Sequence, residues 1–156
     1  MLQPMTNVEA LVKCVDANSS ADSAAPVLIL AGGTGDGVKI TGETVDTQGY
    51  SSVAVVTGYL AALADTKTLS FAHELQESSD DSTWDTAEVV EATTVYGTGT
   101  TGGTNERGKA EFAIDMKLRK RYIRFNVTPD MSATGTDTAT FHTIAVMGGA
   151  NVLPAA

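Results

Sequence analysis

The segment Gly103–Ala110 has the spacing of a phosphate-binding loop, in which two glycines separated by four residues precede a lysine. Ala110 stands where that motif carries a hydroxyl for Mg²⁺. Such a loop also needs a helix after it, because the amides of a helix N-terminus hold the phosphates. A Thr/Gly-rich stretch precedes this segment and an alternating strand pattern follows it. We therefore interpret residues 97–108 as a long, mobile hairpin loop.

A second glycine cluster, Gly32–Gly37, follows the apolar run Val27–Leu30. Its spacing departs from the dinucleotide-binding fingerprint, because Gly33 and Gly35 are followed by Val38 where that fingerprint has a third glycine. The chain then continues as a strand pattern rather than a helix. We predict a β-turn here.

An acidic stretch places Asp80, Asp81 and Asp85 around Trp84. Several carboxylates in one loop are the ligands that Ca²⁺ prefers, but the central glycine and the distal glutamate of a calcium loop are missing. We predict a hairpin turn with Trp84 folded onto the core.

No arrangement of residues identifies an active centre. His73 and His142 each fall inside an expected strand, without a metal-ligating or acid–base partner nearby in sequence. The single cysteine, Cys14, cannot form an internal disulfide and is expected to be a small buried or surface residue. A carboxylate pair for hydrolysis is unspecific among 19 acids. We name no catalytic, cofactor-binding or metal-ligating residue and expect a protein that is not an enzyme.

Charge is distributed unevenly along the chain. Up to Glu106 there are 15 acids and three bases, whereas residues 107–124 hold seven of the ten bases and only two acids. We predict that five cations of this basic segment contribute to contacts with a partner: Lys117, Arg119, Lys120, Arg121 and Arg124. If the strand continued, Lys117, Arg119 and Arg121 would share one face. The alternative interpretation is a solvated sheet face followed by a turn.

The remaining composition narrows the class of partner. A net charge of −9 argues against wrapping nucleic acid, whose binding depends on neutralised phosphates. The longest apolar run, residues 24–31, is too short to span a bilayer, and the first residues lack the basic start of a secretory signal. We expect a soluble protein made in a cytoplasm, with neither nucleic acid nor membrane as a direct partner.

Alternation of apolar and polar residues is the dominant period and predicts strands. The segments that show it best are 53–58, 69–76, 112–119, 122–128 and 139–147. Short strands separated by Gly-, Ser- and Asp-rich turns predict an all-β fold, an antiparallel β-sandwich of jelly-roll-like form. Residues 26–156 are predicted to form this single domain. Residues 1–25 are predicted to form an N-terminal arm, either extended or a short helix.

Three stretches together resemble one group of proteins: Val45–Val56, Leu69–Trp84 and Lys120–Val127. A strand ending in Gln-Glu-Ser, an acidic turn, and a later Lys-Arg-Tyr-Ile-Arg strand are similar to small decoration, or cement, proteins of tailed-bacteriophage heads. The resemblance covers roughly residues 45–149. The segment 97–108 and the N-terminal region are not part of it.

The resemblance implies a function and partners. It implies an all-β subunit that binds the major capsid protein on the outer surface of the head and stabilises contacts between capsomers. Such a protein would be assembled in the host bacterial cytoplasm, reside in the virion and form a homo-oligomer, with a trimer as one candidate. It implies no catalytic residues and no cofactor.

A different class of function remains open from the residues alone. A carbohydrate- or ligand-binding β-sandwich would use exposed aromatic rings to stack on sugars, and Trp84, Tyr96 and Tyr59 could supply them.

Overall fold

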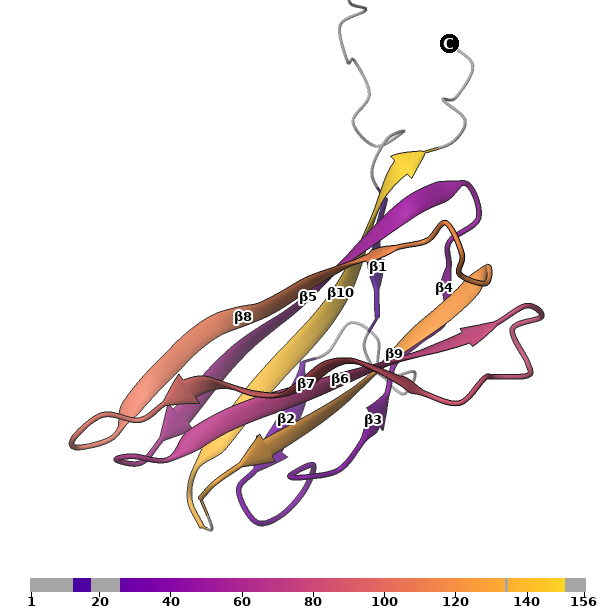
Figure 1. Cartoon of the computed structure of the whole chain (residues 1–156). Coiled ribbons are helices and arrows are strands. Elements are labelled where there is room, and N and C mark those ends of the chain that lie inside the picture. Colours follow the sequence, from indigo (N-terminus) through magenta and orange to yellow (C-terminus); the bar gives the residue numbers. More distant parts are fainter. Residues whose placement is uncertain (1–12, 18–25, 134, 151–156) are drawn as a thin grey trace, which may run out of the picture.

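The computed structural model describes residues 13–17, 26–133 and 135–150 of the 156-residue chain. These ranges contain strands and turns but no helix, so none of them holds a helix that could cross a membrane. Two antiparallel sheets lie face to face as a sandwich (Figure 1). The predicted fold class, an all-β antiparallel β-sandwich, is confirmed.

Each sheet contains three long strands and a pair of short ones. The first sheet has the order β1-β10-β5-β8, with β2 also paired to β10. Its strands are β1 (Lys13–Asp16), β2 (Val27–Leu30), β5 (Tyr50–Leu63), β8 (Thr104–Asp115) and β10 (Thr138–Ala150). The second sheet has the order β3-β9-β6-β7, with β4 also paired to β9. Its strands are β3 (Ile40–Thr41), β4 (Val45–Asp46), β6 (Thr68–Ser78), β7 (Glu88–Thr98) and β9 (Tyr122–Met131).

The connectivity is that of a jelly roll. The strands β1 and β2 share one position beside β10, and β3 and β4 share one position beside β9. Counting each pair as one strand, the two sheets read 1-8-3-6 and 2-7-4-5 along the chain. This order is the double Greek key of a jelly roll. Turns between successive strands therefore gather at the two ends of the sandwich.

Side chains alternate along the central strands, and those that point inward form two apolar clusters. One cluster surrounds Phe125 and Met147, and the other surrounds Phe71 and Phe141, all of them at most 1% exposed. Rings in the second cluster meet edge to face, with the centroids of Phe71 and Phe141 5.4 Å apart. The polar residues Thr57, His73 and Thr143 are also buried, and in sequence they fall between members of the two clusters.

The prediction of a long loop over residues 97–108 is wrong in extent. The turn covers residues 99–103, and β8 begins at Thr104 and pairs with β5 from there onward. Backbone pairing with a long central strand outweighs the weak strand propensity of this polar sequence. Gly108 also has a packing role, because a Cβ atom there would lie 2.7 Å from the hydroxyl of Tyr59. That glycine makes room for the Tyr59 ring between the sheets.

Two predictions concern the N-terminal part of the chain. Residues 13–16 are a strand paired with β10, so the extended alternative holds there. Apart from these residues and Ala17, the predicted arm of residues 1–25 lies outside the described residues. The predicted β-turn at Gly32–Gly37 is confirmed, because the amide of Gly33 donates to the carbonyl of Leu30 at 2.8 Å.

Candidate interaction surfaces

The basic segment does not continue as a strand. After Asp115 the chain turns: the amide of Met116 donates to the carbonyl of Ser51, and the amide of Arg119 donates to that of Met116. The predicted shared face of Lys117, Arg119 and Arg121 is therefore wrong. The strand β8 ends at Asp115, two residues before Lys117, and the bond from Met116 ties the following turn to the start of β5.

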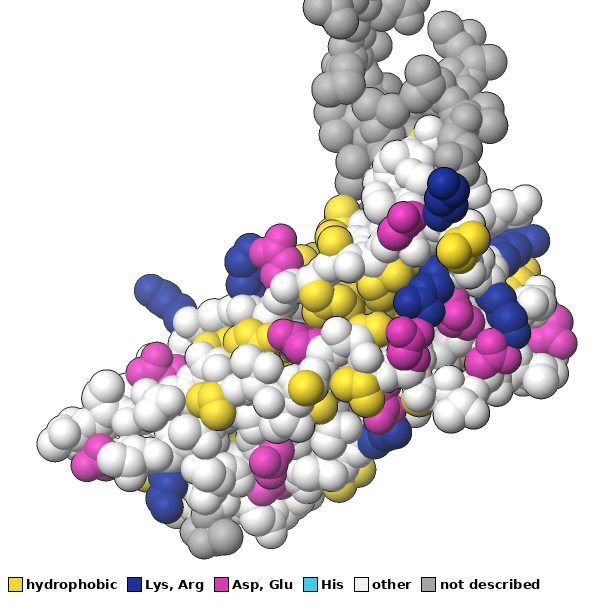
Figure 2. Space-filling model, in the orientation of Figure 1, with side chains coloured by type: hydrophobic (Ala, Val, Ile, Leu, Met, Phe, Trp, Pro, Cys, Tyr) yellow, Lys and Arg dark blue, Asp and Glu magenta, His cyan; other side chains and the backbone are white. Residues whose placement is uncertain are grey.

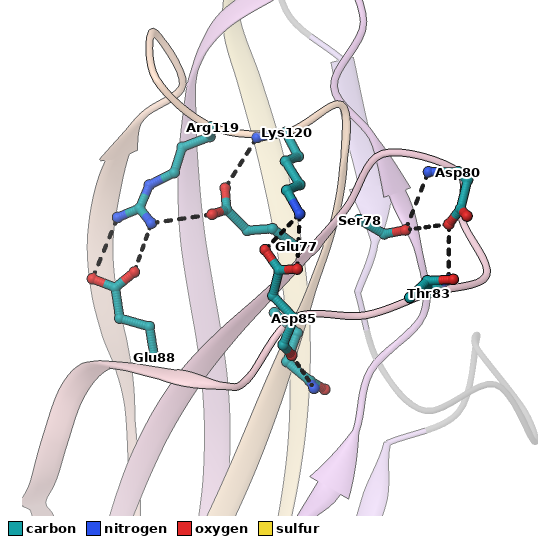
Figure 3. Close-up of polar contacts among 9 residues, drawn as sticks. Glu77, Ser78, Asp80, Thr83, Asp85, Glu88, Arg119 and Lys120 are labelled. Atoms are coloured by element: carbon teal, nitrogen blue, oxygen red, sulfur yellow. Dashed lines mark hydrogen bonds and ion pairs between the residues drawn. The ribbon is translucent and has the colours of Figure 1, made fainter.

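Arg119 is held by two glutamates of the second sheet, one near the end of β6 and one at the start of β7. Its Nη1 lies 2.6 Å from Oε2 of Glu88 and 3.4 Å from Oε2 of Glu77 (Figure 3). The hydrogen bond and charge of Arg119 lower the pKa of Glu88, and the bond to Glu88 raises the pKa of Arg119. The guanidinium thus joins the β8–β9 turn to both ends of the β6–β7 connection.

Lys120 makes a second link between the β8–β9 turn and the β6–β7 connection. Its Nζ lies 2.7 Å from the carboxylate of Asp85, and its backbone amide donates to Oε1 of Glu77 at 3.2 Å (Figure 3). Glu77 therefore accepts from both consecutive residues of the turn, one through a guanidinium and one through the main chain.

Arg121 and Arg124 also find partners within the chain. Arg121 forms a two-pronged pair with Asp46, with bonds of 2.9 and 2.7 Å. Its hydrogen bond to Asp46 raises the pKa of Arg121. Arg124 donates to the side chain of Gln76, and its guanidinium carbon lies 4.2 Å from the centroid of the Trp84 ring.

Four of the five predicted interface cations are thus used within the fold. Lys117 differs, because it makes no ion pair in the part of the chain that the structure describes, and its neighbour Leu118 is 93% exposed. Exposed ion pairs contribute about 0–1 kcal/mol each, so the cluster fixes the arrangement of the loops more than it stabilises the fold. The tip of the β8–β9 turn at Lys117 and Leu118 remains open to a partner.

The acidic turn is organised by hydrogen bonds to the side chain of Asp80. Asp80 accepts bonds from the hydroxyl of Ser78 and from the backbone amide of Thr83, the latter at 2.8 Å (Figure 3). It also accepts a bond of 2.9 Å from the backbone amide of Ser82. These donors, the amide of Thr83 first, strongly lower the pKa of the Asp80 carboxyl. Among the described residues no three His, Cys, Asp or Glu side chains gather as a metal site would require. The predicted turn at this position is confirmed.

The aromatic residues do not form a common stacking platform. Tyr59 and Tyr96 pack against the cluster around Phe71, with the Tyr59 hydroxyl donating to the carbonyl of Tyr96 at 2.6 Å. Trp84 is half-buried at the end of the sandwich that carries the ionic cluster, where Arg124 lies over its ring. The structure brings two of the three rings together between the sheets, whereas sugar stacking needs open faces.

A buried polar chain crosses the core between the two apolar clusters. The hydroxyl of Thr57 lies 2.9 Å from that of Thr143 and 3.0 Å from Nε2 of His73. Nδ1 of His73 lies 2.9 Å from Oε2 of Glu91, whose other oxygen accepts from the hydroxyl of Tyr96. Burial lowers the pKa of His73, although the charge of Glu91 acts in the opposite direction.

This polar chain has the order nucleophile, base and acid found in hydrolytic triads. Thr57 and His73 are, however, only 1% and 0% exposed, so a substrate cannot reach either group. The arrangement links β10 and β5 of one sheet to β6 and β7 of the other. Sequence alone did not reveal it, because His73 and Glu91 come from different strands and Thr143 is distant in sequence.

The outer face of the first sheet carries exposed apolar side chains. Leu28, Leu30 and Leu60 are 53%, 39% and 54% exposed, and register places Leu28 and Leu60 on either side of Thr140. Figure 2 shows a side of the molecule other than this outer face. Charged and apolar side chains are mixed there, and apolar groups are visible between the two sheets. Clustered exposed leucines on a sheet face are characteristic of surfaces that become covered in assemblies.

A scan against protein-family models found no match, and neither did a search of curated proteins. Solved structures similar to the chain include one of the infectious bursal disease virus Gx strain, at a TM-score of 0.53 and 15% identity, covering 91% of this chain and 34% of that one. A VP2 subviral particle of infectious bursal disease virus gives a TM-score of 0.52 and 14% identity, covering 92% and 34%. The chain therefore spans about a third of these proteins. At identities this low, the structural similarity shows a shared fold and nothing about function.

A further structure contains the CBM22-1 and GH10 modules of Clostridium thermocellum xylanase 10B complexed with xylohexaose. It has a TM-score of 0.43 and 14% identity, covering 96% of this chain and 26% of that one. A likeness at this level supports no functional inference.

Proposed function

We propose that this protein is a structural subunit of a virus particle, and more specifically a decoration subunit on the outer surface of a tailed-phage head. The observation that carries the proposal is the jelly-roll fold, which matches structures of infectious bursal disease virus and of its VP2 subviral particle along most of this chain. A non-enzymatic role agrees with the burial of Thr57 and His73, which keeps the nucleophile and base of this arrangement away from substrates.

The phage assignment within that class is supported by the resemblance of three stretches to head decoration proteins. In the fold these stretches meet at one end of the sandwich. Asp46 lies in the first, Glu77 and Trp84 in the second, and Arg121 and Arg124 in the third. The contacts among these residues hold the loops in place. A relative with the same residues would therefore share the same loop arrangement.

The proposed mechanism is thermodynamic. A subunit that binds the assembled shell but not its dissociated parts stabilises the assembled state by linkage. An interface of standard size would bury about 1,600 Å² at each contact. The exposed leucines of the first sheet and the open tip at Lys117 and Leu118 are the surfaces best suited to such contact.

The test is to fractionate lysate of the source on a density gradient while measuring this protein by quantitative mass spectrometry. We expect it to migrate with megadalton particles at a fixed ratio to a major shell protein. Recovery only in the light fractions, with particles present elsewhere in the gradient, would contradict the proposal. The ratio also gives the copy number.

A second arm tests the predicted contacts with the shell. Undecorated particles would be incubated with purified protein carrying Arg121→Glu and Arg124→Glu or, separately, Lys117→Glu and Leu118→Asp. Loss of binding only in the second variant would assign the contact to the turn tip. Intact binding in both would remove all four residues from the interface.

A further inference from the structure

The sandwich has four sheet edges, and three of them are poorly suited to further pairing. The edges formed by β1 with β2 and by β3 with β4 consist of strands of only two to four residues. The β7 edge is irregular, because its pairing with β6 shifts register at three places. Short or bulged edges are a common protection against sheet extension.

The remaining edge, β8, is long and regular. It has 12 residues and pairs with β5 without a register shift, from Ser52 opposite Asp115 to Leu63 opposite Thr104. No described strand pairs with its other side. In Figure 1 nothing is drawn beyond β8, and in Figure 2 basic and acidic side chains project along the same margin. A strand of this kind presents a row of backbone donors and acceptors to another chain.

Charges on the outer face of β8 follow an order that is complementary to itself. Arg107 and Lys109 come first along the strand, and Glu111 and Asp115 come last. Lys109 and Glu111 are 62% and 51% exposed and form an ion pair with each other. In an antiparallel pair of two such strands, the basic half of each would face the acidic half of the other.

A two-fold axis through Ala110 gives the best charge register. It places Lys109 opposite the copy's Glu111, and it places Arg107 diagonally between the copy's Glu111 and Asp115. Moving the axis to residue 109 would set Lys109 against its own copy, and moving it to residue 111 would do the same with Glu111. Like charges directly opposite each other are destabilising.

The inward-facing side chains of the two paired β8 strands also permit this register. Ala110 would face its own copy, and Phe112 would face the copy's Gly108, the smallest residue available. Ala110 is 1% exposed and Phe112 half-buried within one chain, so no charged group is forced inward at the axis.

We propose that β8 is the self-association surface of this protein: two copies pair their β8 strands antiparallel about a two-fold axis at Ala110, over residues 105–115, and join their first sheets into one continuous sheet. The interface is isologous, because the same strand serves both partners. The proposal does not rest on the capsid role, and purified protein suffices to test it.

The first test is analytical ultracentrifugation of the purified chain over a range of concentrations. We expect a dimer whose dissociation constant rises about tenfold in Lys109→Glu and in Glu111→Lys, because each change creates two like-charge pairs across the axis. The double variant Lys109→Glu/Glu111→Lys should recover most of the original affinity, since both directly opposite pairs are again opposite in charge and only the diagonal contact between Arg107 and position 111 becomes like-charged. Lys67→Glu, the same charge change in the exposed β5–β6 turn, is the control and should have no effect.

The second test measures the register. Directly opposite residues of antiparallel strands lie within disulfide reach, whereas diagonal ones do not. In a Cys14→Ser background, a mixture of Lys109→Cys and Glu111→Cys proteins should form a disulfide-linked heterodimer under mild oxidation, and neither protein alone should. A monomer at all concentrations, a dimer indifferent to Lys109→Glu, or equal cross-linking of either cysteine protein alone would overturn the proposal. Circular dichroism of each variant separates these outcomes from misfolding.

Discussion

Replacing Thr57 by valine would remove one hydroxyl from the centre of the sandwich with almost no change in side-chain size. That hydroxyl lies 3.0 Å from Nε2 of His73 and 2.9 Å from the hydroxyl of Thr143. All three residues are at most 1% exposed. In the variant, both neighbours lose a partner at a position where water cannot replace it.

The expected cost follows from these two stranded groups. Each buried polar group without a partner costs about 1–3 kcal/mol. The added methyl group of valine offsets about 1 kcal/mol of this through burial. We therefore expect Thr57→Val to lower the free energy of unfolding by about 1–5 kcal/mol.

Urea unfolding at neutral pH, followed by far-UV circular dichroism and Trp84 fluorescence, measures this change. One low protein concentration should be used throughout, so that association does not contribute. Thr57→Ser keeps the hydroxyl and should lose only about 1 kcal/mol for the missing methyl group. Thr57→Val combined with Thr143→Val removes one of the stranded partners and should recover part of the loss, because apolar replacement of both partners is nearly neutral.

The reasoning would be refuted by a Thr57→Val protein within about 0.5 kcal/mol of the original at an unchanged denaturant dependence, since that is the range of an ordinary surface substitution. The polar chain would then contribute nothing to holding the two sheets together. A loss equal in the serine and valine variants would mean that the hydroxyl contributes no more to stability than the methyl group does.

Three further predictions test other contacts. Burial lowers the pKa of His73, so at acidic pH the unfolded chain binds a proton more readily than the folded protein does. As the pH falls below about 6.5, the free energy of unfolding should therefore decrease by up to about 1.4 kcal/mol per pH unit. Above that pH this histidine should cause no change. His73→Phe should flatten that slope in urea titrations, and an unchanged slope would exclude His73 as its source. Arg119→Ala should return the pKa of Glu88 toward its ordinary value in an NMR titration, whereas an unmoved pKa would mean that the ion pair is not formed in solution. Gly99→Ala should lower the free energy of unfolding in urea by about 2 kcal/mol or more, because the added Cβ would lie 2.0 Å from a backbone oxygen of the β5–β6 turn. The control is Gly58→Ala, where a Cβ would enter open space and the loss should be smaller.

The long strands could be predicted from sequence because their signal is local. On β10, Phe141, Ala145 and Met147 point inward at alternate positions, and this period of two is visible without knowing what they contact. The start of β8 gave no such signal. Residues 104–108 are polar and glycine-containing, and only their pairing with β5 identifies them as a strand.

The pairing of the basic segment could not be predicted from its own residues. Its acidic partners, Asp46, Glu77 and Glu88, are between 31 and 75 residues away along the chain. The sequence shows an excess of positive charge between residues 107 and 124, but the jelly-roll topology decides which of these charges meet acids within the same chain. The same argument applies to His73, whose partners belong to β5 and β7.

Topology therefore separates two kinds of charge that look alike in the sequence. Arg119 and Arg121 lie where the turn and strand end reach loops of the second sheet, and their charge is largely satisfied inside the chain. Lys109 lies on an edge strand that no described strand pairs with on one side, and its ion pair with Glu111 is formed within a single strand. A contact within one strand does not determine how the chain folds, because both residues lie on the same face in any strand conformation. Such charges are free to specify a partner, and their order along β8 matches a second copy in one antiparallel register. The edge strand, more than the densest basic cluster, is accordingly where the charge pattern of this chain carries information about assembly.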